Sequence, residues 1–333
     1  MNDQFPQLIE TVDDAPSTKN HFPIVAQLGV LAFVLTGIFG TLYVVGDNSQ
    51  QPTVTQTPPP PIIEIKQQTL PPQKIEDVEL RATAAYVWDV TGQRALYNKN
   101  ASEPLPLASI TKLMTTLLAH ELIADNEAAV VSLNAIRQEG SSGLFAGEEL
   151  EIKDLQELAL ISSSNDAAYA LAASVGNLLG DNDPTNQFIA GMNIRAAELG
   201  LETLEFKSTT GLDISETEPG ATGSARDVTF LMEYIITHYP DLIAPTKQAE
   251  TLVYNTAGAY HEAHNTNEIV LDVPNLLGSK TGYTDLAGGN LTIAFDAGLN
   301  RPIIITVLGS TRDERFTDVL TLVKAVQESV GVQ

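Results

Sequence analysis

The order of the predicted strands and helices is the feature that most constrains the fold of this chain. A hairpin comes first, with strands at residues 82–89 and 94–98, and a helix is predicted to begin at Ser109. Helical patterns then cover most of 121–180, 188–199 and 225–239, strands follow at 252–255, 277–283, 291–295 and 302–308, and a helix closes the chain at 315–330. We therefore expect the first strands to pair with the late ones in one sheet, with a helical insertion between them.

Residues 22–45 form an uncharged, apolar run between two polar segments. About twenty helical residues span the hydrocarbon core of a bilayer, so we predict a transmembrane anchor here. The polar flanks disfavour a buried core helix, and the length of the run disfavours a cleaved signal peptide. Residues 1–21 are predicted to be a disordered tail, and the proline-rich residues 46–74 an extended linker to a globular domain at 75–333.

The charge balance excludes one class of function. The chain has 42 acidic and 18 basic residues, a formal net charge of -24, and no cysteine. Nucleic-acid binding needs clustered Lys and Arg, so we expect no nucleic-acid partner. Without cysteine the chain has neither disulfides nor thiolate metal ligands. An anionic substrate would need a local cationic pocket.

A serine and a lysine three residues apart, Ser109 and Lys112, stand at the start of an apolar helical pattern. Residues i and i+3 share a helix face, which places the hydroxyl near the amine. A serine hydroxyl becomes a nucleophile when a neighbouring base takes its proton, and a partly buried lysine can be that base. The competing interpretation is a serine that caps the helix beside a solvated lysine.

Two further polar elements interrupt apolar patterns. Ser163 and Asn165 lie in a serine-rich run between two helical segments, where a hydroxyl could relay a proton and an amide could bind a peptide backbone. The alternative is a loop with a helix cap. Lys280, Thr281 and Gly282 lie in a predicted strand and supply a positive charge, a hydroxyl and room for a ligand. A phosphate-binding loop is excluded, because Ser279 and not glycine precedes the lysine.

His261 and His264 suggest a zinc helix at first sight. The two histidines of a zincin helix are four residues apart, whereas these are three apart in a stretch that we interpret as a loop. We expect no metal site.

The three elements, in this order, resemble those of the serine D-alanyl-D-alanine carboxypeptidases, which are low-molecular-mass penicillin-binding proteins. The similarity covers residues from about 78 to 333 and includes 108–115, 165–168, 211–212, 224–227, 280–285 and 287–288. It implies an α/β sandwich of the β-lactamase/transpeptidase type: an antiparallel sheet flanked by helices, plus an all-helical lobe. Ser164 departs from the family pattern, which has glycine between Ser163 and Asn165.

The resemblance also implies roles for single residues. Ser109 would attack the penultimate D-alanine carbonyl of a peptidoglycan stem peptide, Lys112 would take its proton, and Ser163 would relay a proton to the leaving amine. The backbone N–H groups of Ser109 and Tyr283 would form the oxyanion hole. The remaining substrate-binding residues would be Asn165, Lys280, Thr281, Gly282, Tyr283 and Arg315, with Arg312 a competitor of Arg315 for the terminal carboxylate. β-Lactams would acylate the same serine, and no cofactor is expected.

Several alternatives stay open at this level. A D,D-endopeptidase would use the same residues, and a β-lactamase would need a glutamate in an E-x-x-L-N element that we do not find between Asn165 and Lys280. A non-catalytic wall-binding protein is disfavoured by the intact Ser109 and Lys112. Many relatives have a C-terminal β-domain and amphipathic anchor, for which this sequence shows no counterpart. We therefore expect residues 22–45 to hold the domain at the cell membrane, on the extracytoplasmic side.

Overall fold

The computed structural model describes residues 74–76, 78–140, 143–180 and 183–330, which all belong to one compact unit at 67–333. The predicted tail and anchor, and the linker up to residue 73, lie outside the described residues. Within the described part of the chain, no helix is both long and apolar enough to cross a bilayer.

A five-stranded antiparallel sheet forms the centre of the domain, in the order β10-β11-β12-β1-β2. Its strands are β1 (Ala84–Asp89), β2 (Arg94–Lys99), β10 (Leu276–Thr284), β11 (Gly288–Asp296) and β12 (Pro302–Ser310). The first strand pairs with the last, with Ala84 opposite Leu308. This confirms that the hairpin at the start joins the strands at the end of the chain.

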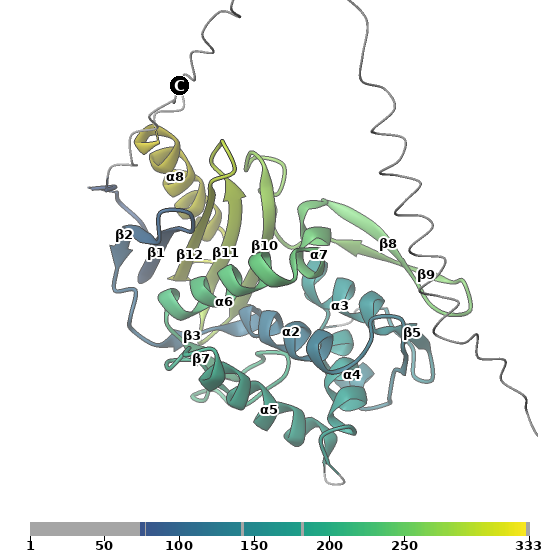
Figure 1. Cartoon of the computed structure of the whole chain (residues 1–333). Helices are drawn as coiled ribbons and strands as arrows, with labels where there is room; N and C mark the ends of the chain where they lie inside the picture. The colour runs from purple at the N-terminus through teal and green to yellow at the C-terminus, as the bar shows by residue number, and fades with distance from the viewer. Residues whose placement is uncertain (1–73, 77, 141–142, 181–182, 331–333) are drawn as a thin grey trace, which may run out of the picture. The chain divides into compact units, whose positions relative to one another are not determined.

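Helices cover both faces of this sheet. Helix α8 (Glu314–Ser329) packs on β11 and β12, and α6 (Ala225–His238) packs on the opposite face, as Figure 1 shows. Successive side chains of a strand point to opposite faces, so Ile303 and Ile305 join the core under α8 while Ile304 joins the core on the other side. The result is the sandwich of an antiparallel sheet flanked by helices that the family resemblance implied.

The remaining helices form a lobe on the α6 side of the sheet (Figure 1). They are α2 (Lys112–Leu122), α3 (Ile152–Ile161), α4 (Asn165–Gly176), α5 (Pro184–Glu198) and the short α7 (Pro240–Ile243), with 3-10 turns η1 (Ala108–Thr111), η2 (Ala135–Arg137) and η3 (Ala244–Lys247). Short strands complete the unit: β3 (Leu105–Pro106), β6 (Glu205–Phe206) and β7 (Ala221–Gly223) pair together, as do β4 (Ala128–Val130) with β5 (Glu149–Glu151) and β8 (Glu250–Tyr254) with β9 (Tyr260–His264).

Three sequence predictions need correction. The helix predicted from Ser109 begins as the 3-10 turn η1, and α2 starts only at Lys112. Much of 123–151 is not helical, since Gly140, Gly143 and Gly147 take positive φ angles that turn the chain. The stretch around His261, interpreted as a loop, is strand β9.

Candidate active site

The turn η1 presents Ser109 between strand β3 and helix α2. Ala108 has φ 49°, and a Cβ added at Gly211 would lie 1.9 Å from the Ala108 carbonyl oxygen, so the segment around Gly211 presses directly on this turn. The side chain of Ser109 does not cap α2, whose N-cap is Thr111. The competing interpretation as a cap therefore fails, and the partner of the Ser109 hydroxyl is Lys112.

The Lys112 amine lies at the centre of the site, and its side chain is fully buried. Its Nζ is 2.7 Å from Ser109 Oγ, 2.7 Å from Asn165 Oδ1 and 2.8 Å from the Thr210 carbonyl oxygen. The last two oxygens only accept hydrogen bonds, so they take both N–H groups of a neutral amine. The nitrogen lone pair is then left for the hydroxyl proton of Ser109.

The surroundings of Lys112 favour this neutral form. Burial, and then the positive charge of Lys280, lower the pKa of Lys112 well below its usual range. Burial and the charge of Arg315 likewise lower the pKa of Lys280 to about 7. Because a general base must be unprotonated near the working pH, this environment suits Lys112 to the task.

Ser163 lies in the loop between α3 and α4, and Asn165 is the first residue of α4. Ser163 has φ 59°, an uncommon backbone angle for serine, and its Oγ accepts a hydrogen bond of 2.9 Å from Lys280 Nζ. Asn165 Nδ2 donates to the Glu139 carbonyl oxygen at 2.6 Å, which turns Oδ1 toward Lys112. Ser164, the departure from the family pattern, caps α4 by accepting from the Ala167 N–H at 3.0 Å.

Strand β10 carries Lys280, Thr281 and Gly282 along the edge of the sheet beside η1. A Cβ at Gly282 would lie 2.7 Å from the Leu107 carbonyl oxygen and 3.2 Å from the backbone nitrogen of Ser109. The sequence analysis explained Gly282 by room for a ligand. The structure adds a second reason, because the backbone of η1 approaches the strand too closely for a side chain at this position. This contact sets the position of the Ser109 N–H relative to β10.

These elements enclose a cavity of about 330 Å³. It is lined by Ser109, Ser163, Asn265, Thr266, Glu268, Thr281, Gly282, Tyr283, Arg312 and Arg315. Arg315 is buried and donates from Nη1 to the Gly282 carbonyl oxygen at 2.8 Å, whereas the guanidinium of Arg312 lies 5.3 Å from the centre of the Tyr283 ring.

The sequence analysis missed three residues that line this cavity, Asn265, Thr266 and Glu268. They follow β9 and belong to no recognisable local motif.

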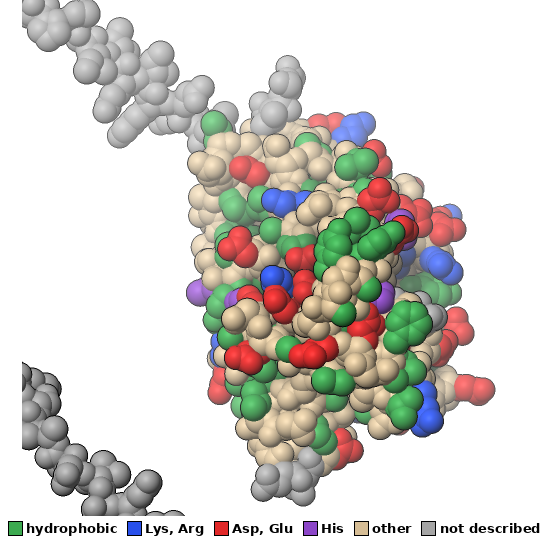
Figure 2. Space-filling view, turned by 90° about the vertical axis from the view of Figure 1, so that its right-hand side faces the viewer, with side chains coloured by type: hydrophobic (Ala, Val, Ile, Leu, Met, Phe, Trp, Pro, Cys, Tyr) green, Lys and Arg blue, Asp and Glu red, His purple; other side chains and the backbone are tan. Residues whose placement is uncertain are grey.

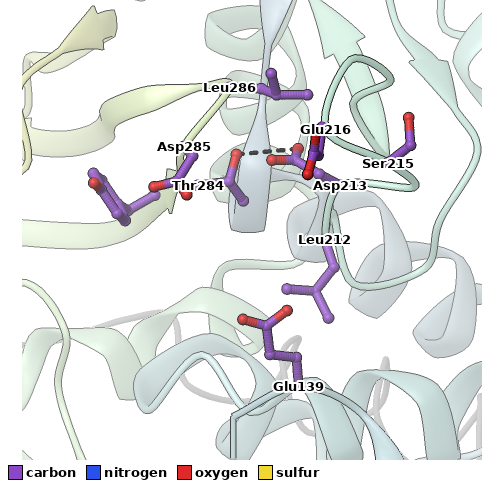
Figure 3. A pocket seen from close by; sticks show the side chains of 9 residues that line it. Glu139, Leu212, Asp213, Ser215, Glu216, Thr284, Asp285 and Leu286 are labelled. Carbon is purple, nitrogen blue, oxygen red and sulfur yellow. Dashed lines mark hydrogen bonds between the residues drawn. The ribbon is translucent and has the colours of Figure 1, made fainter.

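A second cavity, of about 540 Å³, shares the lining residue Tyr283 with the first; Figure 3 shows the other side chains of its wall. Glu139, Asp213, Glu216 and Asp285 contribute carboxylates to its wall, and Thr284 Oγ1 donates to Asp213 at 3.1 Å. Acidic side chains are also spread over the face shown in Figure 2. The smaller cavity contains two arginines, Arg312 and Arg315, against one acidic side chain, Glu268, so it is the one of the two cavities whose charge favours an anionic group.

The two histidines that suggested a metal helix lie on opposite faces of β9. His261 points inward, with Nε2 2.6 Å from Glu148 Oε1, while His264 is exposed. In the part of the chain that the structure describes, no group of three or more His, Asp or Glu side chains could hold a metal ion.

Comparison with known proteins identifies the family. A sequence profile described as D-alanyl-D-alanine carboxypeptidase matches residues 68–312, which is most of the chain. The chain belongs to this family. The D-alanyl-D-alanine carboxypeptidase DacF of Bacillus subtilis is 32% identical over 234 residues, covering 68% of this chain and 57% of its relative. A D-alanyl-D-alanine endopeptidase of Pseudomonas aeruginosa is 30% identical over 236 residues, covering 69% of this chain and 72% of that protein.

The fold of the D-alanyl-D-alanine carboxypeptidase family is found among solved structures as well. Penicillin-binding protein D2 of Listeria monocytogenes, in its ampicillin-bound form, superposes with a TM-score of 0.62 at 28% identity, covering 75% of this chain and 98% of that one. The resemblance inferred from the three sequence elements is therefore confirmed at the level of family and fold.

Proposed function

We propose that this protein is a serine D,D-carboxypeptidase that removes the terminal D-alanine from peptidoglycan stem peptides. The observation that carries the proposal is the contact of 2.7 Å between Ser109 Oγ and the buried Lys112 amine. Membership of the family supports the same activity. This chain spans less than two thirds of the length of DacF, so the activity remains a proposal for the protein as a whole.

The first chemical step forms an acyl-enzyme. Lys112 takes the hydroxyl proton as Ser109 Oγ bonds to the carbonyl carbon of the penultimate D-alanine, and the carbonyl electrons move onto oxygen. The backbone N–H groups of Ser109 and Tyr283 stabilise this oxyanion. When the C–N bond breaks, Ser163 passes a proton, supplied by Lys280, to the departing amine of D-alanine. Water then attacks the ester: Lys112 returns its proton to Ser109 Oγ as that oxygen leaves the acyl carbon, and the proton lost by the water passes through Ser163 to Lys280.

Binding of the peptide is assigned to the groups around this centre. Asn165 binds the peptide backbone, while Lys280, Thr281 and Arg315 bind the terminal carboxylate. The direct test is Ser109→Ala, which should abolish covalent labelling by a fluorescent penicillin without loss of the folded state. Full labelling of this variant would refute the assignment of the nucleophile.

A D,D-endopeptidase is the second candidate, because the Pseudomonas aeruginosa relative is named as one. Mass analysis of muropeptides digested with the wild-type protein separates the two activities: a carboxypeptidase shortens pentapeptides, whereas an endopeptidase cleaves cross-links. Labelling by penicillin without either product would favour a binding protein, and rapid release of hydrolysed penicillin would favour a β-lactamase.

We further propose that residues 22–45 anchor the protein in the cell membrane, with residues 75–333 outside the cytoplasm. The uncharged apolar run and the extracytoplasmic location of peptidoglycan support this topology. Protease added to intact spheroplasts should cut the proline-rich linker and release the domain. Protection of the domain would indicate the inverted topology.

A further inference from the structure

The Thr281 hydroxyl, assigned above to the substrate carboxylate, has a close neighbour that the proposed mechanism does not use. Thr266 Oγ1 lies 2.6 Å from Thr281 Oγ1, and both residues line the cavity of about 330 Å³. Thr266 follows strand β9 and is partly buried. At this distance one of the two hydroxyls donates its proton to the other.

The direction of that hydrogen bond decides what Thr281 can offer a ligand. A hydroxyl carries one proton, so a Thr281 that donates to Thr266 would present only lone pairs to a carboxylate. If Thr266 donates, the proton of Thr281 is free to point at the substrate. The other acceptor near Thr266 Oγ1 is the Ile161 carbonyl oxygen at 3.5 Å, the outer limit of a hydrogen bond. The Thr266 hydroxyl therefore donates its proton to Thr281 Oγ1, the nearer of the two acceptors, at 2.6 Å.

The backbone at Thr266 is held independently of its hydroxyl. The Thr266 N–H donates to the Ile161 carbonyl oxygen at 3.1 Å, at the end of α3 and two residues before Ser163. The preceding Asn265 donates from Nδ2 to the carbonyl oxygens of Thr246 and Gln248 at 2.8 and 2.7 Å. A change confined to the Thr266 hydroxyl should therefore leave the main chain in place.

We propose that Thr266 is a positioning residue that donates its hydroxyl proton to Thr281 and so fixes Thr281 as a donor to the terminal carboxylate of the substrate. The inference rests on the proposed carboxypeptidase function. It makes Thr266 a determinant of specificity for a free carboxylate, acting through Thr281.

The test compares Thr266→Val, which has the same shape but no hydroxyl, with Thr266→Ser, which keeps the donor. Each is assayed for kcat and KM on a peptide that ends in D-alanyl-D-alanine and on the same peptide with a terminal amide. Thr266→Val should raise KM for the acid about three- to tenfold, the range of one hydrogen bond, with little change in kcat. The amide should be affected much less, and Thr266→Ser should behave like wild type.

A matched control is Thr229→Val. On α6, Thr229 Oγ1 donates to Thr306 Oγ1 at 2.7 Å, both residues are buried and neither lines the cavity, so this variant reports the structural cost of losing such a hydroxyl contact. Wild-type values for Thr266→Val, an equal loss on acid and amide, or failure of Thr266→Ser would each overturn the proposal. A folded wild-type protein that cleaves neither peptide would instead refute the carboxypeptidase function itself.

Discussion

Replacing Gly282 by alanine tests whether the close contact between β10 and η1 sets the geometry of the reaction. The added Cβ would lie 2.7 Å from the Leu107 carbonyl oxygen and 3.2 Å from the backbone nitrogens of Ser109 and Ile110. All three are main-chain atoms, so no side chain can rotate away to make room. The strand and the turn must therefore move apart.

The size of the effect follows from those distances. Ordinary van der Waals contact for a Cβ begins at 3.4 Å, so relief of the 2.7 Å contact needs a displacement of about 0.7 Å. A misplacement of about 1 Å at a reacting centre can cost about 100-fold in rate. We therefore expect acylation of Ser109 by penicillin to slow by about 10- to 100-fold. Overpacking should also lower the free energy of unfolding by about 1–3 kcal/mol.

The assay is the second-order rate of labelling by a fluorescent penicillin, measured together with the melting temperature. Gly278→Ala is the matched control, because Gly278 lies on the same strand but its added Cβ would meet the side chain of Ile243 at 2.5 Å. It should lose stability and still acylate at nearly the wild-type rate. Acylation of Gly282→Ala at the wild-type rate, or equal slowing in both variants, would refute the argument.

Three further outcomes follow from the charges in the cleft. Lys112→Arg should slow acylation by at least about 100-fold, since a guanidinium cannot act as the base, and near-normal labelling would mean that Lys112 is structural. Arg315→Ala should reduce kcat/KM for a free-acid peptide about ten- to a hundredfold and for its amide much less, whereas a selective loss with Arg312→Ala would move the carboxylate site to that residue. Lys280 has a pKa of about 7 in the folded protein against an ordinary value of 10.5, so the unfolded chain binds more protons between these limits and stability should rise with pH across this window. Urea unfolding at about pH 7 and about pH 10 should show that Lys280→Met weakens this rise, and an unchanged pH dependence would contradict it.

Local spacing was sufficient to predict the contact between Ser109 and Lys112, because the two residues are three apart in a helical turn. It could not predict that Asn165 Oδ1 and the Thr210 carbonyl oxygen would complete the surroundings of the amine, since these residues are 53 and 98 positions away. The burial that lowers the pKa of Lys112 is likewise a property of the packed lobe and sheet.

Strand β9 shows why part of the sheet structure was missed. Its inward-facing residues are His261 and Ala263, so the polar imidazole interrupts the alternation by which a strand is recognised. That imidazole is tolerated inside because Glu148 pairs with it. Thr266 was missed for a related reason, because its contact with Thr281 arises only when the chain returns from β9 to β10.

The buried cationic side chains of the cleft link the binding of an anion to the stability of the folded protein. Within the described residues, Lys280 and Arg315 are buried and neither forms an ion pair with an acidic side chain. An anion that binds beside Lys280 and Arg315 supplies the missing counter-charge in the folded state alone, and so stabilises that state by mass action. Free D-alanine, the product of the proposed reaction, should then raise the melting temperature with the logarithm of its concentration once that concentration exceeds the dissociation constant. The dissociation constant obtained from this rise should agree with the one obtained from product inhibition.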